Sequence, residues 1–108
     1  MPFHDPETRQ KKQLLAGVQA RTFWGERMLL ALVDLDANAI IPPHSHPHEQ
    51  GGIVLQGELE FNIAGEIRGL HAGDLYVIPS GVEHSVHVGA QPAQVLDIFS
   101  PLREEYKY

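Results

Sequence analysis

Hydrophobic and polar residues alternate most clearly between residues 58 and 63, where Leu59, Phe61 and Ile63 are separated by polar side chains. Successive side chains of a β-strand point to opposite faces, so this period of two predicts a strand with one face in a core and the other in water. Glycine-containing turns on either side predict that this strand belongs to two hairpins.

A second pattern, a nearly continuous apolar run, occupies residues 28–35. Its shortness and the polar turn at residues 36–38 favour a strand over a helix, which is the competing interpretation. A continuous run predicts burial on both faces. One face would line a barrel, and the other would meet a second sheet or a partner chain. Further apolar segments predict strands at residues 19–23, 53–55, 75–78, 84–88 and 95–99.

Short strands separated by turns about every eight to twelve residues are typical of an all-β sandwich or barrel. At 108 residues the chain corresponds to a single domain. Within it we expect an N-terminal arm (1–17), the barrel (18–103) and a charged surface tail (104–108). The arm contains Asp-Pro-Glu at residues 5–7, which is typical of one helical turn, and it could also cross to a neighbouring subunit. A core of this size is modest, and we therefore expect a homodimer.

The charge and composition narrow the range of partners. The formal net charge is −6, from 8 basic and 14 acidic residues, and no basic run is longer than two lysines. We therefore expect no nucleic-acid partner. No apolar run approaches the length of a membrane span, and the first residues have no signal-peptide pattern, so we expect a cytoplasmic protein without a membrane partner. The absence of cysteine excludes disulfides and thiolate metal sites.

Residues 44–50, which read HSHPHEQ, hold the densest group of metal-ligating side chains. In a strand, side chains two apart share a face, so we expect His44 and His46 to converge. Gln50 could turn in as a third ligand, and His84, in a Pro-x-Gly-x-x-His segment, offers a fourth. Neutral imidazoles suit divalent transition metals such as Zn, Ni, Fe or Mn. We predict a metal site made of these four residues, with packing as the alternative role for each histidine.

These segments resemble the two motifs of the cupins, which are small double-stranded β-helix (jelly-roll) barrels. The first motif is Gly, five residues, His-x-His, three or four residues, Glu, six residues, Gly. Its positions are occupied here by Asn38, His44, His46, Gln50 and Gly57. The second motif, Gly, five residues, Pro-x-Gly, two residues, His, three residues, Asn, is represented by Gly73, Pro79, Gly81, His84 and Val88. The resemblance covers roughly residues 28–103 and implies a cupin barrel.

A narrower resemblance is to the pectin-degradation cupins, which ketonise 4,5-unsaturated monouronates. It rests on residues 44–50 and on residues 97–104, which read DIFSPLRE, although the Asp-x-Phe-x-Pro-x-Arg pattern also occurs in other small cupins. In that family three histidines and one glutamine bind the metal, and an aspartate, a phenylalanine and an arginine act near the C-terminus. The resemblance implies His44, His46, Gln50 and His84 as metal ligands and Asp97, Phe99 and Arg103 as catalytic residues.

The chemistry of these side chains favours proton transfer on an anionic small molecule. A glutamine ligand cancels none of the metal charge, which favours Lewis-acid chemistry over redox cycling. Asp97 could act as a general acid or base, Phe99 could pack against a sugar, and Arg103 could bind a substrate carboxylate. We expect metal-dependent ketonisation or isomerisation of an unsaturated uronate or a similar carbohydrate acid.

Two other functions stay open at this point: a cupin dioxygenase with a redox metal, and a non-enzymatic module that binds a sugar or a metal. Ordinary structural roles are also open for the proposed catalytic residues. Asp97 could bond backbone at the barrel mouth, Phe99 could belong to the core, and Arg103 could form a surface or interface salt bridge. Trp24 and Tyr76 are expected to pack.

Overall fold

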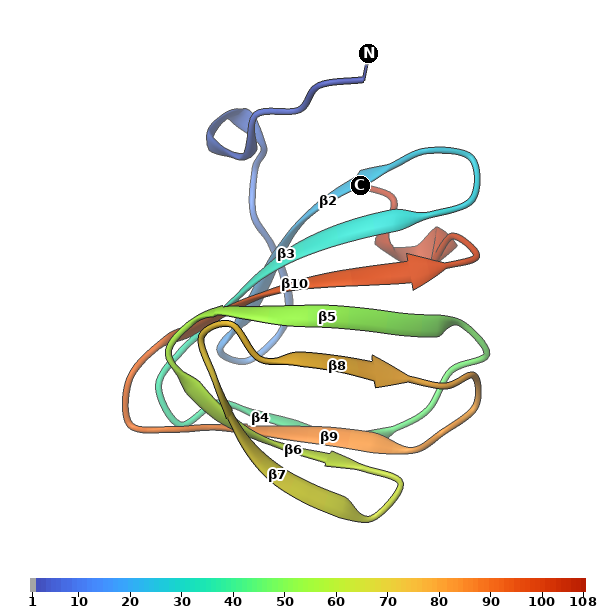
Figure 1. Cartoon of the computed structure of the whole chain (residues 1–108). Coiled ribbons are helices and arrows are strands. Elements are labelled where there is room, and N and C mark those ends of the chain that lie inside the picture. Colours follow the sequence, from blue (N-terminus) through green and yellow to red (C-terminus); the bar gives the residue numbers. More distant parts are fainter. Residues whose placement is uncertain (1) are drawn as a thin grey trace.

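The computed structural model describes residues 2–108 and folds them into two antiparallel sheets that face each other (Figure 1). The six-stranded sheet has the order β1-β2-β3-β10-β5-β8, and the four-stranded sheet has the order β4-β9-β6-β7. The strands are β1 (Lys12–Leu15), β2 (Val18–Trp24), β3 (Leu29–Leu35), β4 (Ile40–His44), β5 (Glu49–Gln56), β6 (Glu58–Ile63), β7 (Glu66–His71), β8 (Leu75–Ile78), β9 (His84–Val88) and β10 (Ala93–Ser100). The predicted all-β fold is confirmed.

The alternating stretch at residues 58–63 forms β6, and its apolar side chains lie where the period of two places them. Leu59 and Phe61 are buried between the sheets, and Ile63 is half-buried at the end of the strand. β6 pairs with β7 through a tight hairpin, as the turn signals predict. The second predicted hairpin, between β5 and β6, is wrong, because the turn at residues 56–57 leads from the six-stranded sheet into the four-stranded one. β5 differs from its prediction, because it begins at Glu49 and not at Ile53. The two glycines at 51 and 52 therefore lie inside the strand.

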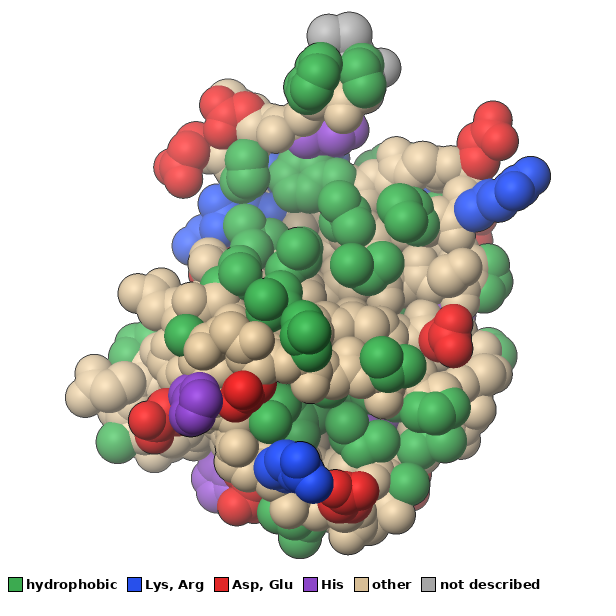
Figure 2. Space-filling model, in the orientation of Figure 1, with side chains coloured by type: hydrophobic (Ala, Val, Ile, Leu, Met, Phe, Trp, Pro, Cys, Tyr) green, Lys and Arg blue, Asp and Glu red, His purple; other side chains and the backbone are tan. Residues whose placement is uncertain are grey.

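The apolar run at residues 28–35 forms β3, and within the single chain only its inner face is fully buried. Leu29, Ala31 and Val33 are buried between the sheets, whereas Leu30 and Leu32 point outward and are half-buried. The four-stranded sheet covers the inner face, and within residues 2–108 no second sheet covers the outer one (Figure 1). Figure 2 shows hydrophobic side chains gathered on this outer face of the six-stranded sheet.

The N-terminal segment packs against its own chain. Residues 12–15, within the segment expected to be an arm, form β1 and pair with β2. The helical turn expected at residues 5–7 is a 3₁₀ turn, η1 (Pro6–Thr8), with the Asp5 carboxylate accepting from the Glu7 N–H. The Arg21 guanidinium donates to the Pro6 carbonyl at 3.1 Å. No helix within the part of the chain that the structure describes is long and apolar enough to cross a membrane.

Candidate metal centre and its cavity

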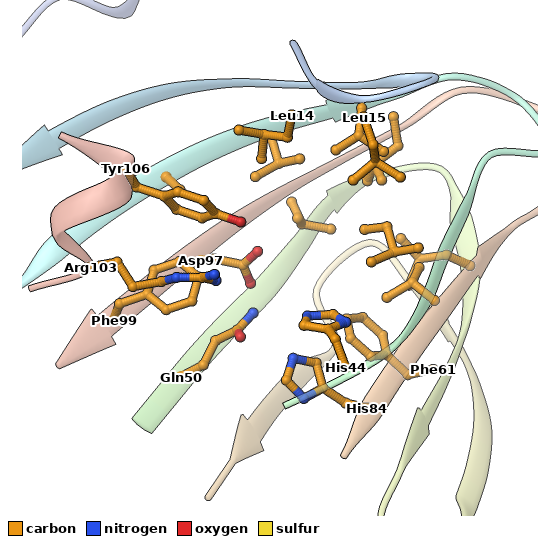
Figure 3. Close-up of a pocket in the computed structure, with 18 residues that line it drawn as sticks. Leu14, Leu15, His44, Gln50, Phe61, His84, Asp97, Phe99, Arg103 and Tyr106 are labelled. Atoms are coloured by element: carbon orange, nitrogen blue, oxygen red, sulfur yellow. The ribbon is translucent and has the colours of Figure 1, made fainter. Parts of the chain in front are cut away.

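The candidate site lies between the two sheets, at the end of the barrel where β10 ends and β9 begins (Figure 3). A cavity of about 70 Å³ opens there. Apolar side chains from both sheets and from β1 line most of it. The polar and aromatic residues that line it are His44, Gln50, Phe61, His84, Asp97, Phe99, Arg103 and Tyr106.

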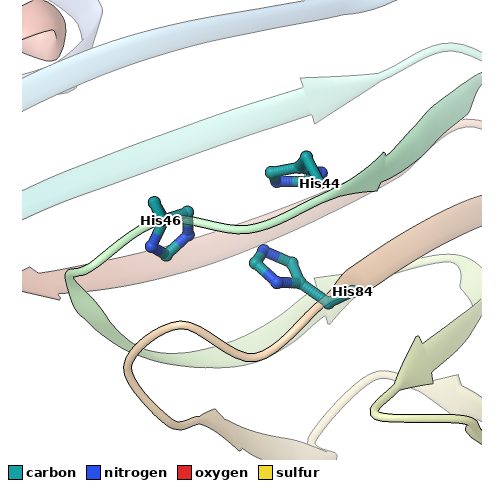
Figure 4. Close-up of side chains that lie close together, drawn as sticks. All are labelled: His44, His46 and His84. Carbon is teal, nitrogen blue, oxygen red and sulfur yellow. The ribbon is translucent and has the colours of Figure 1, made fainter.

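Three histidines come together beside this cavity (Figure 4). One ring nitrogen from each of His44, His46 and His84 can be chosen so that all three lie within 4.8 Å of one another. His44 ends β4 and faces His84 at the start of β9 in the strand register. His46 lies beyond the end of β4, in the turn toward β5. The two neighbouring histidines therefore converge, but the turn brings them together and not the strand alternation that we expected.

Hydrogen bonds fix the tautomer of all three rings. In His44, His46 and His84 the Nδ1 atom lies 2.9 Å from a backbone carbonyl oxygen two residues away along the chain. A carbonyl oxygen can only accept, so Nδ1 carries the proton and Nε2 presents its lone pair. Metal-ligating histidines typically have this arrangement, because the second nitrogen orients the ring.

The position of Gln50 gives a test of whether a cation fits here. Its Oε1 lies 3.0 Å from the Nε2 of His46, and both atoms are acceptors in the arrangement above. The Gln50 amide nitrogen points toward the Asp97 carboxylate and donates to it (Figure 3). The opposite orientation of the amide would place its oxygen against the carboxylate, and two acceptors cannot bond each other. The Nε2 of His84 is buried and has no hydrogen-bond partner within residues 2–108. A divalent cation satisfies all of these lone pairs, and the residues fit one.

Burial favours the neutral form of two of the three histidines, His46 and His84. Burial, and then the positive charge of Arg103, lower the pKa of His46. Burial lowers the pKa of His84 to about 4, with further contributions from His44 and His46. Neutral imidazole is the form that binds a metal, so these two rings are ready to act as ligands at neutral pH without first losing a proton.

Asp97 lies on the inner face of β10 and is almost fully buried. Burial raises the pKa of its carboxyl to about 6, although hydrogen bonds from Tyr76 and Gln50 and the charge of Arg103 act in the opposite direction. The Tyr76 hydroxyl donates to Oδ1 of Asp97 at 2.5 Å. Burial, followed by the charge of Asp97, raises the pKa of Tyr76, so this hydroxyl keeps its proton. Tyr76 was expected only to pack, and the sequence alone carries no signal for this bond.

The C-terminal tail folds back over the cavity, so that Tyr106 lines it while Glu104, Glu105 and Lys107 are exposed at the surface. The guanidinium carbon of Arg103 lies 4.0 Å from the ring centroid of Tyr106 and 5.1 Å from that of Phe99. The Thr22 hydroxyl donates to the Tyr106 carbonyl at 2.5 Å and fixes this return. Glu105 is the acidic partner of Arg103, at 3.4 Å. Arg103 is therefore a largely buried cation whose ion pair is long.

A comparison with models of protein families assigns the chain to a family. Residues 31–99, more than half of the chain, match the model of the cupin domain. The chain belongs to the cupins. Asn38, at the position of the first motif's glycine, adopts a φ of 63°, in the left-handed region that asparagine tolerates.

Several solved structures share the fold of this cupin. An RmlC-like cupin from Shewanella frigidimarina superposes with a TM-score of 0.92 and 26% identity, over 98% of this chain and 96% of that one. KdgF from Halomonas sp. superposes with a TM-score of 0.91 and 29% identity, over 97% of both chains. A predicted oxalate decarboxylase from Thermotoga maritima shares the fold, with a TM-score of 0.78 and 20% identity over 91% of this chain and 97% of that one. None of the curated proteins matches the sequence.

The predicted site residues of this cupin lie together. Those that line the cavity are His44, Gln50, His84, Asp97, Phe99 and Arg103. His46 lies behind them, with its ring centroid 5.7 Å from that of Phe99. Sequence reasoning missed Tyr76 and Tyr106, and also Leu14, which lines the cavity from β1. The alternation of apolar residues along the tail is too short to have indicated Tyr106.

Proposed function

We propose that this cupin holds a divalent transition metal and catalyses the ketonisation of an unsaturated uronate or the isomerisation of a similar carbohydrate acid. The observation that carries the proposal is the placement of a buried carboxylate, Asp97, and a largely buried cation, Arg103, at one cavity beside the cluster of three histidines. The resemblance of residues 44–50 and 97–104 to the pectin-degradation cupins supports the choice, and so does the likeness to KdgF from Halomonas sp. over nearly the whole length of the chain.

His44, His46, Gln50 and His84 would hold the metal. Bound there, the cation supplies Lewis-acid stabilisation of negative charge on a substrate oxygen. The ligands are three neutral imidazoles and a neutral amide, so they leave the full charge of the cation available to an anionic substrate. The metal could be Zn, Ni, Fe or Mn, because imidazole and amide ligands suit all four.

Asp97 would move the proton. In ketonisation an enol oxygen loses a proton and the neighbouring carbon gains one, so the reaction needs no oxidant, reductant or second substrate. The carboxyl of Asp97 has a pKa near 6 and lines the cavity, and it can therefore accept and return a proton near neutral pH. Its apolar surroundings keep competing water away from the transferred proton.

Arg103 and Phe99 would bind the substrate. The guanidinium of Arg103 is planar and matches a carboxylate with two parallel hydrogen bonds. The enclosed space has a volume of about 70 Å³, about that of two water molecules. It therefore admits the reacting end of a sugar acid and leaves the remainder at the mouth, between Phe99 and the tail.

We also propose that the outer face of the six-stranded sheet pairs with a second copy of this chain. Two cross-strand rows without charge run across it; they are Leu30, Ile98, Gly51 and Val77, and Leu32, Leu96, Ile53 and Leu75. Leu75 and Val77 are 73% and 66% exposed in the single chain. A face four strands wide and seven residues long measures about 19 by 23 Å, a flat area of about 440 Å², against the roughly 800 Å² that each partner buries in a standard interface. Two chains of net charge −6 can approach through these uncharged rows, beside which Arg21 and Asp34 neutralise each other in an ion pair.

The test of the activity follows the ultraviolet absorbance of the conjugated double bond of a 4,5-unsaturated monouronate. Metal-loaded protein should accelerate its decay, a chelator should abolish the acceleration, and added metal should restore it. The double bond is lost when the enol becomes a ketone, so the signal reports the reaction itself. If protein with its metal content verified by elemental analysis does not accelerate the decay, the ketonisation proposal is wrong, and oxygen uptake is the next assay.

A further inference from the structure

The structure assigns a second role to Tyr76: it is a positioning residue that holds the Asp97 carboxylate in one orientation at the cavity, in a slot created by Gly52. The inference rests on the proposed function for its kinetic test. A second measurement, described below, tests it independently of that function.

The strand register explains how Tyr76 reaches Asp97. Asp97 on β10 is opposite Gly52 on β5, and Gly52 is opposite Tyr76 on β8. The two polar residues are thus separated by a whole strand, on the inner face of the sheet. Any side chain at position 52 would stand between them. Glycine has none, and a Cβ atom built there would overlap the Tyr76 ring.

The hydroxyl of Tyr76 does more than fill space. Its ring packs against Phe61, with the centroids 4.3 Å apart, and a phenylalanine at position 76 would pack in the same way. The hydroxyl adds a buried donor that is satisfied by Asp97 alone among the hydrogen bonds of the described chain. A buried hydroxyl without a partner is costly, so the pair is coupled: each group needs the other in place.

The bond determines which part of the carboxylate remains available. Tyr76 occupies Oδ1 of Asp97, and the Gln50 amide nitrogen lies on the metal side of the same group (Figure 3). On the opposite side of Asp97 in the sheet stands Ala31, which has no polar side chain. The carboxylate has a broad two-fold torsion of its own, and the hydroxyl stops that rotation. One oxygen is thereby presented to the substrate in a constant direction.

The first test replaces Tyr76 by phenylalanine in the full-length, metal-loaded protein. We expect kcat to fall about 10- to 100-fold, as misplacement of a reacting group does, while KM and metal content stay within twofold. The matched control is Ile78→Val on the same strand, which is buried but does not contact Asp97; its kcat should not change. A purely structural role would lower the melting temperature of Tyr76→Phe with kcat unchanged, and that result would overturn the inference.

The second test uses Gly52→Ala, alone and combined with Tyr76→Phe. The methyl group displaces the ring at position 76, so the single variant should lose kcat to a similar degree. In the Tyr76→Phe background the bond is already lost, so the added substitution should change kcat less than twofold. Losses that multiply in the double variant would show two independent effects and contradict the coupling.

Crystal structures decide the question even without activity. In Tyr76→Phe the Asp97 carboxylate should rotate or occupy two orientations, whereas in Ile78→Val it should keep its wild-type orientation. An unchanged carboxylate in Tyr76→Phe would contradict the positioning role. A wild-type protein that binds metal but does not ketonise the uronate would refute the proposed function, and the crystal comparison would still test Tyr76.

Discussion

Asp97 and Ile98 are neighbours on β10, yet they belong to two different surfaces. Asp97 faces the inner side of the six-stranded sheet, where the polar groups of the site are buried beside apolar side chains. Ile98 faces the outer side, where apolar side chains stand in rows and are exposed in the single chain (Figure 2). The inner face therefore carries buried polar side chains, and the outer face carries exposed apolar side chains. Each is unusual for its location, and each indicates contact with another molecule.

The largest expected effect concerns the cavity between the two sheets, at His84. His84→Ala should lower activity about 1,000-fold or more and lower the metal content, because Lewis-acid stabilisation is worth several kcal/mol. His87→Ala, three residues along β9 and exposed on the opposite face, is the matched control and should keep both. Elemental analysis and the uronate assay measure the two variants. Equal metal binding by both would remove His84 from the ligand set.

Asp97→Asn should lower kcat about 100- to 10,000-fold while leaving the metal content unchanged, because the amide cannot take up or release the proton. Asparagine has the size of aspartate and keeps one oxygen that can accept from the Tyr76 hydroxyl, so we expect the protein to remain folded. Asp74→Asn, in the turn before β8, provides a surface comparison. A fully active Asp97→Asn protein would exclude Asp97 as the acid or base.

The buried His84 should also make the metal-free protein less stable against unfolding at acidic pH. His84 has a pKa of about 4 in the folded chain against 6.5 as its ordinary value. Between these pH values the unfolded chain binds a proton that the folded chain does not, so stability is complete above about pH 6.5 and is lost as pH falls toward 4. The loss from His84 should be at most about 3 kcal/mol. Urea unfolding from pH 7.5 to 4.5 measures it; His84→Gln should flatten the profile, and His87→Gln should not.

On the outer face, Ile98→Glu should convert a dimer into a monomer and weaken self-association about 100-fold or more, because two buried carboxylates would face an apolar partner. The uronate activity should change less than a few-fold, since Ile98 points away from the cavity. Ile67→Glu, exposed on β7 of the other sheet, should leave the oligomeric state unchanged. Analytical ultracentrifugation distinguishes the outcomes, and a wild-type monomer at micromolar concentration would contradict the proposed pairing.

The smallest expected effect is at the mouth of the cavity. Arg103→Lys keeps the charge but loses the planar pair of hydrogen bonds, and KM should rise about tenfold with kcat nearly unchanged. Lys107→Arg, further along the tail, should leave both constants unchanged. A fall in kcat at constant KM would indicate that Arg103 acts on the transition state and not on substrate binding.

The resemblance to the pectin-degradation cupins supplied the proposed catalytic residues. Local patterns predicted most of the strands, although not β1, because alternation and turn residues act over a few positions. The period of two at β6 and the motif spacing around His44 and His84 are of this kind. The partner of Asp97 could not be predicted, because the contact with Tyr76 depends on the order β10-β5-β8 and on a glycine between them. What covers the outer face of β3 could not be predicted for a related reason: an apolar run does not reveal whether that face is covered within the chain or by a partner.

The central position of β10 has a consequence for the order in which the protein matures. β10 lies between β3 and β5, and its register joins Leu29 with Phe99 and Leu35 with Ala93. Contacts so distant along the chain form slowly, typically in milliseconds to seconds. During synthesis the histidines emerge before Asp97, since the N-terminal part of a chain is made first. The nascent protein therefore has its three histidines before it has Asp97, and insertion of β10 is the step that completes the set of polar residues at the cavity.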